Sequence, residues 1–94
     1  MIKIVLIIKE DCVACDIVKR VITQAINKAE TDISLKTIMS NPIDDERYMI
    51  KKYPTTLFFK DKSNISLARL EGSFPIDYLN KVIDKLKIEC NEWT

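Results

Sequence analysis

The sequence predicts an α/β domain in which three helices flank a four-stranded mixed sheet. Short apolar runs alternate with segments whose apolar residues recur at helical spacing, in the order strand, helix, strand, helix, strand, strand, helix. The first and third strands are the most apolar and are expected in the centre of the sheet, which gives the strand order 2-1-3-4. The chain of 94 residues can bury one core, so residues 1–94 are expected to form a single domain.

The first half of the chain has the pattern of a βαβ unit. Ile2–Ile8 is almost entirely apolar, as is typical of a central strand covered on both faces. Apolar residues at helical spacing predict a helix within residues 16–30, and Asp11 is expected to be its N-cap. Residues 32–39 alternate between apolar and polar side chains, which predicts a strand nearer the sheet edge.

A second helix is predicted in the middle of the chain. Ser40 or Asn41 can cap a helix that has Pro42 at its first position, acidic residues in its first turn, and Lys51 and Lys52 in its last turn. The Tyr-Pro pair that follows is expected to end this helix.

A hairpin and a helix complete the predicted fold. Residues 56–60 form a strongly apolar strand, D-K-S-N is a polar turn, and residues 65–71 form the returning strand. Gly72, the only glycine, marks the exit from this strand. The last helix begins near Ile76 and carries apolar residues three and four positions apart as far as Cys90.

Composition narrows the classes of function. There are 15 basic and 14 acidic residues and no block of one sign, so we expect the protein to bind neither nucleic acid nor a membrane surface. The uninterrupted apolar run from Ile4 to Ile8 is shorter than the core of a secretory signal, and three cysteines do not make a disulfide framework. We therefore expect a cytoplasmic protein. The chain has no histidine, so its chemistry must come from thiols, carboxylates or lysines.

Two cysteines, Cys12 and Cys15, follow the first strand in the stretch K-E-D-C-V-A-C-D. Such a pair fits a redox couple, half of a metal site, or core packing. A structural zinc site needs four protein ligands, and beyond the pair the chain offers only a distant Cys90, which we expect to pack in the core, so no metal site is expected. The start of a helix favours the redox couple, because its unpaired N–H groups and dipole stabilise a thiolate.

Three motifs together resemble the thioredoxin/glutaredoxin superfamily, and in particular a small glutaredoxin-like thioredoxin. They are D-C-V-A-C at residues 11–15, Y-P-T-T-L-F-F-K at residues 53–60 and L-E-G-S-F at residues 70–74. The resemblance implies a thioredoxin-like fold. It also implies that Pro54 is a cis-proline that opens the third strand and packs against the active-site cysteines.

Details within the motifs point to different branches of this superfamily. Lys9 stands where many glutaredoxins have a lysine, and C-V-A-C is similar to the motif of redoxins that supply electrons to ribonucleotide reductase. The single Gly72 resembles thioredoxin, because the Gly-Gly with which many glutaredoxins hold glutathione is missing. The chain also departs from thioredoxin. Asp11 replaces the usual tryptophan, and Leu6 stands at about the place of the buried, proton-shuttling aspartate.

The sequence therefore predicts a thiol–disulfide oxidoreductase that reduces protein disulfides by dithiol exchange. Cys12 is expected to attack a target disulfide and Cys15 to resolve the mixed disulfide. Tyr53, Pro54 and Thr55 are expected to pair with an extended substrate segment through their backbone. The full set of expected substrate-binding residues is Lys9, Val13, Ala14, Tyr53, Pro54, Thr55 and Gly72.

The expected partners are protein disulfides, with ribonucleotide reductase as a candidate, and either thioredoxin reductase or glutathione as the electron donor. No cofactor is expected beyond this donor, and the chain is expected to act as a monomer. Two alternatives stay open from the sequence: a glutathione-dependent glutaredoxin, and a thioredoxin-like binding module whose cysteines are not catalytic.

Overall fold

The sheet has the predicted strand order, β2-β1-β3-β4. The computed structural model describes residues 2–29, 32–60, 63 and 65–92, with side chains as far as Lys87. Along the chain, the elements are β1 (Ile2–Ile8), α1 (Val13–Lys28), β2 (Ile33–Met39), α2 (Pro42–Arg47), β3 (Thr55–Lys60), β4 (Ser66–Glu71) and α3 (Ile76–Glu92). The predicted helix end at Glu30, part of the predicted turn at residues 61–64 and the side chain of Cys90 lie outside the described residues.

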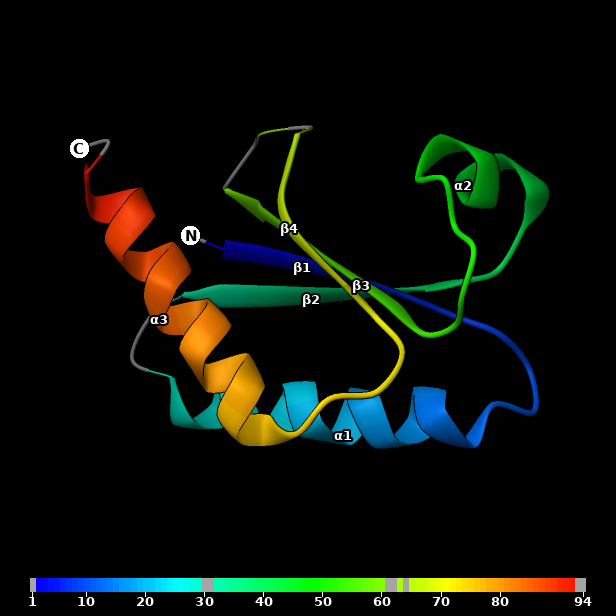
Figure 1. Ribbon diagram of the computed structural model, residues 1–94, viewed down its shortest axis with the longest axis horizontal. Coiled ribbons are helices and arrows are strands. Elements are labelled where there is room, and N and C mark those ends of the chain that lie inside the picture. The colour runs from blue at the N-terminus through cyan, green and yellow to red at the C-terminus, as the bar shows by residue number, and fades with distance from the viewer. Residues whose placement is uncertain (1, 30–31, 61–62, 64, 93–94) are drawn as a thin grey trace.

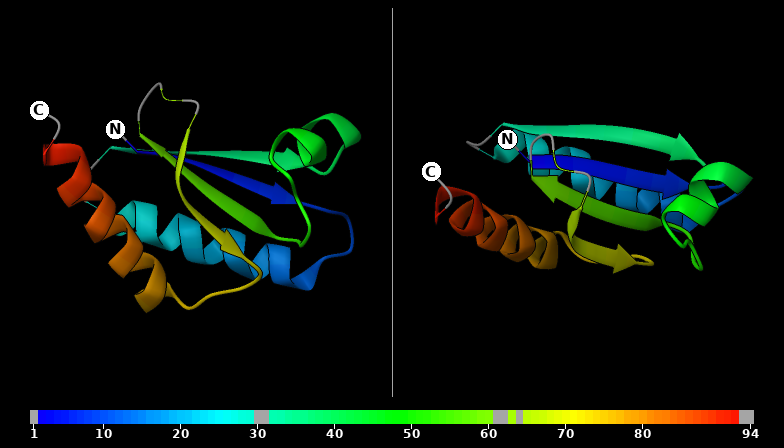
Figure 2. Two further views of the ribbon diagram at one scale, coloured as in Figure 1. Left: turned by 45° about the horizontal axis from the view of Figure 1, so that its top comes forward. Right: turned by 90° about the horizontal axis from the view of Figure 1, so that it is seen from above.

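The central strands are β1 and β3, as their apolar sequences predict. β1 pairs in parallel with β2 and antiparallel with β3, and β3 pairs antiparallel with β4. Helices α1 and α3 cover one face of this sheet, whereas α2 lies beyond one end of it (Figures 1 and 2). Within the described residues, the predicted four-stranded mixed sheet with three helices is thus confirmed.

Two apolar clusters hold the layers together, one on each face of the sheet. Between the sheet and helices α1 and α3, the fully buried members are Ile2, Ile4, Leu6, Val18, Ile22, Ala25, Phe58, Leu79, Ile83 and Leu86. On the opposite face, Val5, Ile7, Leu57 and Phe59 pack against the partly buried Ile38, Tyr48, Ile50 and Tyr53. Burial of such side chains is the main stabilising contribution to the fold.

Helix α2 begins as predicted but ends earlier. Its N-cap is Asn41, whose side-chain oxygen accepts a 2.9 Å hydrogen bond from the backbone N–H of Asp44. The prediction that the helix continues to Lys52 is wrong, because it ends at Arg47 and Met49 adopts a left-handed backbone with φ of 53°. None of the residues of α2 is buried. The apolar side chains that follow the helix pack on the sheet instead.

The segment that follows, residues 48–54, is called the α2–β3 loop below. It runs back to the start of β3 at the end of the sheet where β1 leads into α1 (Figure 1).

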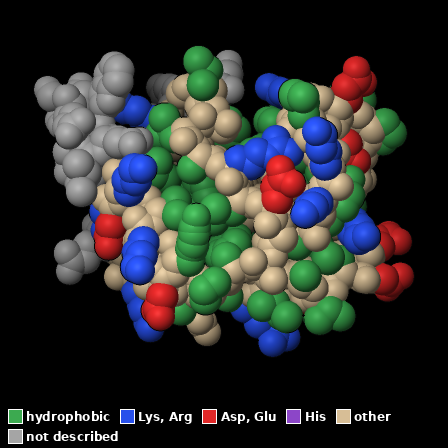
Figure 3. All heavy atoms as spheres, in the orientation of Figure 1, with side chains coloured by type: hydrophobic (Ala, Val, Ile, Leu, Met, Phe, Trp, Pro, Cys, Tyr) green, Lys and Arg blue, Asp and Glu red, His purple; other side chains and the backbone are tan. Residues whose placement is uncertain are grey.

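On the face shown in Figure 3, lysine and arginine side chains are interspersed with aspartate and glutamate around a strip of hydrophobic side chains. No helix in the described part of the chain is both long and apolar enough to cross a membrane.

Candidate active site

Cys12 and Cys15 lie at the start of α1 and form a disulfide, with their Cα atoms 5.2 Å apart. Cys12 is the N-cap residue, and its Sγ accepts a 3.1 Å hydrogen bond from the backbone N–H of Cys15. The prediction that Asp11 caps this helix is therefore wrong. Asp11 instead has a left-handed backbone with φ of 53°, which aspartate tolerates better than most residues and which turns the chain into the helix.

The two cysteines differ in exposure. Cys12 is partly exposed, whereas Cys15, which belongs to the first turn of α1, is only 2% exposed. Between them, Val13 is 75% exposed and Ala14 is partly exposed, so this turn presents a small apolar surface beside Cys12. A disulfide in solution can therefore approach Cys12 directly. The buried Cys15 is instead accessible through its neighbour Cys12.

The predicted substrate-binding segment lies next to the end of β1. The Tyr53–Pro54 peptide bond is cis, and Thr55 is the cross-strand partner of Ile7, which places Pro54 beside the strand end that leads to Cys12. The side chain of Thr55 is fully buried, and its hydroxyl donates a 2.6 Å hydrogen bond to the carbonyl oxygen of Lys52. Pro54 is also fully buried, so of these three residues only the half-buried Tyr53 presents surface to solvent.

Gly72 joins this segment to β4. Its backbone N–H donates a 2.8 Å hydrogen bond to the carbonyl oxygen of Pro54. The backbone of Gly72 has a φ of 82°, which lies in the left-handed region that glycine adopts without strain. The structure thus brings Tyr53, Pro54, Thr55 and Gly72 together, and their role in binding substrate stays a prediction.

Lys9 lies against Tyr53 in this structure. Its ammonium group is 5.5 Å from the centre of the Tyr53 ring, a cation–π contact across the end of β1. The Lys9 side chain is therefore placed beside the predicted substrate-binding segment.

Sequence reasoning missed a polar cluster behind Tyr53. The hydroxyls of Ser40 and Tyr53 both donate to Oδ2 of Asp45, at 2.6 and 2.7 Å, and lie 2.7 Å from each other. The backbone N–H of Ser40 also donates a 2.7 Å hydrogen bond to the carbonyl oxygen of Ile8 in β1. This cluster ties the ends of β1 and β2, helix α2 and the α2–β3 loop together. Only the residue types, two hydroxyls and a carboxylate, could have suggested it.

The cluster shifts two pKa values. The hydrogen bonds from Ser40 and Tyr53 lower the pKa of Asp45 below its ordinary value and outweigh partial burial, which acts in the opposite direction. The pKa of Tyr53 is raised. The neighbouring Ser40 hydroxyl favours the phenolate, because it can donate to it, but the hydrogen bond to Asp45, partial burial and the Asp45 charge together favour the neutral phenol.

No carboxylate lies at the position where the resemblance places a buried aspartate. Leu6 is fully buried there among apolar side chains, whereas Glu10 and Asp11 are both exposed. Within the described residues, no group of three or more cysteine, aspartate or glutamate side chains is arranged to hold a metal ion.

The sequence matches no family model and no curated protein. Several solved structures are similar in fold. One is a thioredoxin-2 described as a component of the malaria parasite protein secretion machinery, with a TM-score of 0.79, 20% identity, and coverage of 90% of this chain and 82% of that one. A chloroplastic thioredoxin z has a TM-score of 0.77, 20% identity, and coverage of 94% and 80%. Thioredoxin f2 of Chlamydomonas reinhardtii has a TM-score of 0.74, 18% identity, and coverage of 89% and 77%.

These likenesses define the class of protein. The chain has the thioredoxin-like fold that its three motifs predict, with a disulfide-bonded cysteine pair at the first turn of α1.

Proposed function

We propose that this protein is a thiol–disulfide oxidoreductase that reduces protein disulfides. One observation carries the proposal: Cys12 and Cys15 form a disulfide at the start of α1, with Cys12 partly exposed and Cys15 buried. The thioredoxin fold of the chain supports it, because this fold is common to the thioredoxins that the chain resembles.

The reduced protein begins the reaction with the Cys12 thiolate, which the N–H groups of the first turn of α1 stabilise. The thiolate attacks one sulfur of the target disulfide, so the target S–S bond breaks, a mixed disulfide with Cys12 forms and the first target sulfur leaves as a thiolate. Cys15, after losing its proton, attacks the sulfur of Cys12. This step releases the second target thiolate and leaves the Cys12–Cys15 disulfide. Two electrons pass to the target, whose sulfurs take up protons from solvent.

The oxidised protein then needs two electrons from an external donor. We propose a thioredoxin reductase or glutathione in the cytoplasm, where thiols are kept reduced. Ribonucleotide reductase is a candidate target on the likeness of C-V-A-C to the redoxins that serve it. Coupled assays that contain NADPH with either thioredoxin reductase, or glutathione and glutathione reductase, distinguish the two donors and so test the glutaredoxin alternative.

Reduction of insulin by dithiothreitol tests the activity itself. We expect the wild type to accelerate precipitation of the insulin B chain and Cys12→Ser to abolish this acceleration. Cys90→Ala is the matched control, because it removes a cysteine outside the pair, and it is expected to keep the activity. A folded wild type without activity would instead support the binding-module alternative.

A further inference from the structure

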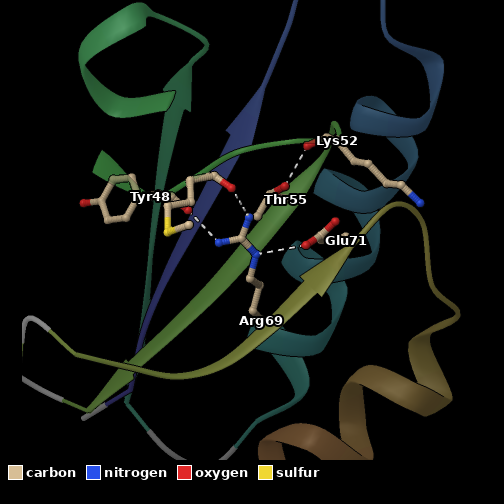
Figure 4. A network of polar contacts seen from close by, with 6 residues as sticks. Tyr48, Lys52, Thr55, Arg69 and Glu71 are labelled. Carbon is tan, nitrogen blue, oxygen red and sulfur yellow. Dashed lines mark hydrogen bonds and ion pairs between the residues drawn. The ribbon is translucent and has the colours of Figure 1, made fainter. Parts of the chain in front are cut away.

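The α2–β3 loop is hydrogen-bonded at one end to Arg69 of β4 and at the other to Gly72, the residue that follows β4. At its start, the guanidinium group of Arg69 donates hydrogen bonds of 2.6 Å to the carbonyl oxygen of Tyr48 and 2.7 Å to that of Met49 (Figure 4). At its end, the carbonyl oxygen of Pro54 accepts the hydrogen bond from Gly72, three residues beyond Arg69. These two attachments add to the packing of the loop on the sheet and to the Ser40–Asp45–Tyr53 cluster, which also hold the loop in position.

Arginine is chemically suited to the first of these attachments. The last carbonyl groups of a helix have no partner within the helix, and α2 ends immediately before the two carbonyls that Arg69 binds. The planar guanidinium presents several donors at fixed angles, so it binds two neighbouring carbonyls at once, whereas a lysine ammonium lacks this fork. The third donor, Nε, lies 3.1 Å from the carboxylate of Glu71, which holds the group in place.

We propose that Arg69 is a positioning residue for protein substrates, which it serves by fixing the α2–β3 loop. The inference rests on the proposed function. The loop carries Tyr53 and Pro54, and its far end is held by Thr55 and by the Ser40–Asp45–Tyr53 cluster. With Arg69 in place, the loop is ordered before a substrate binds. Without it, part of the binding free energy is spent on ordering the loop.

Arg69 contacts neither cysteine, so its effect should be confined to binding. The partners of its guanidinium in the described residues are Tyr48, Met49 and Glu71. A protein substrate that contacts Tyr53 should bind less tightly when the loop is not fixed. A small disulfide such as 5,5′-dithiobis(2-nitrobenzoate), which needs only access to Cys12, should not.

The test compares wild type, Arg69→Lys, Arg69→Met and the control Arg20→Met, which removes an exposed arginine of α1. For each we would measure kcat and KM with insulin, the rate with the small disulfide, and the reduction potential against glutathione. We expect Arg69→Met to raise KM for insulin about fivefold, the equivalent of ordering one or two side chains, with kcat unchanged. Arg69→Lys should lie between wild type and Arg69→Met. The rate with the small disulfide and the potential should not change.

The possible outcomes separate the inference from the proposed function. If the wild type reduces neither substrate, the proposed function fails. The inference fails if the wild type is active and both folded Arg69 variants keep its KM for insulin. It also fails if the activity of these variants falls by the same factor with insulin and with the small disulfide. Should Arg69→Met not fold, Arg69→Lys decides the question, because it keeps the charge and loses only the fork. A general loss of stability would lower the melting temperature without raising KM for insulin alone.

Discussion

Thr55 and Thr56 are adjacent residues of β3 and both are fully buried, yet their hydroxyl groups are in opposite situations. The hydroxyl of Thr55 donates to the carbonyl oxygen of Lys52, whereas that of Thr56 has no hydrogen-bond partner among the described residues. A buried hydroxyl without a partner loses its hydration and gains nothing in return, so it destabilises the fold.

This difference predicts that valine substitutions at the two positions change the free energy of unfolding in opposite directions. Thr56→Val removes a polar atom that has no partner and should raise the free energy of unfolding by about 1 kcal/mol. Thr55→Val leaves the carbonyl of Lys52 without its donor and should lower the free energy of unfolding by about 1–2 kcal/mol. Urea unfolding of the two variants measures both values. Equal changes, or a destabilised Thr56→Val, would contradict this description of β3.

On the proposed mechanism, Cys12 and Cys15 should be distinguishable by what a variant of each accumulates. Cys15→Ser keeps the partly exposed Cys12 and lacks the buried thiol that we propose resolves the mixed disulfide. We therefore expect Cys15→Ser to accumulate a mixed disulfide with a protein substrate, and Cys12→Ser to accumulate none. Non-reducing electrophoresis followed by mass spectrometry measures the adduct. Multiple turnovers by Cys15→Ala at the wild-type rate would show that the two-cysteine mechanism is wrong.

The Asp45 cluster predicts a loss of stability in acid. The folded-state pKa of Asp45 lies below its ordinary value of 3.8, so its contribution to stability is present above that value and is lost as the pH falls through the folded pKa. Melting temperatures of wild type and Asp45→Asn should therefore converge as the pH is lowered below about 4. A constant difference between them down to pH 2 would mean that the carboxylate charge is not the source of the stability.

Tyr53 predicts a second change at high pH, with the opposite sign. Its folded-state pKa lies above its ordinary value of 10.0, so the phenol in the unfolded chain loses its proton first. The stability that depends on the Tyr53 hydroxyl is full below that value and is lost as the pH rises through the folded pKa. Tyr53→Phe should abolish this alkaline change and also raise the pKa of Asp45, which NMR titration of the carboxyl carbon can follow.

The order and position of the strands could be predicted because they depend on local apolar patterns. Nearly every residue is buried in two strands, Ile2–Ile8 and Thr55–Lys60. A strand is covered on both faces in this way when it lies in the centre of the sheet. The cysteine pair could be found for a similar reason, since two cysteines three positions apart at the start of a helix are a local signal.

The parts that could not be predicted depend on contacts between residues distant in the sequence. Lys51 and Lys52 have the pattern of a helix end, but the chain turns earlier, at Met49. The carbonyl oxygen of Met49 is bound there by Arg69, 20 residues further along the chain. Neither Asp45 nor Ser40 signals that it will meet Tyr53. Aspartate is a preferred capping residue, which predicts Asp11 as the N-cap, whereas the N-cap is Cys12, whose sulfur accepts the hydrogen bond.

The charges next to Cys12 predict how its reduction potential can be changed. Glu10 and Asp11 are exposed carboxylates that precede Cys12, and they oppose the stabilisation of its thiolate by the start of α1. Glu10→Gln combined with Asp11→Asn should stabilise the reduced form and raise the potential by on the order of 10–20 mV, because exposed charges contribute a few tenths of a kcal/mol each. Asparagine tolerates the left-handed backbone of residue 11, so folding should be kept. Equilibration with glutathione measures the potential, and Asp77→Asn with Asp84→Asn, which neutralises two carboxylates of α3, is the control. An unchanged or lowered potential in the first pair would refute this role for the two carboxylates.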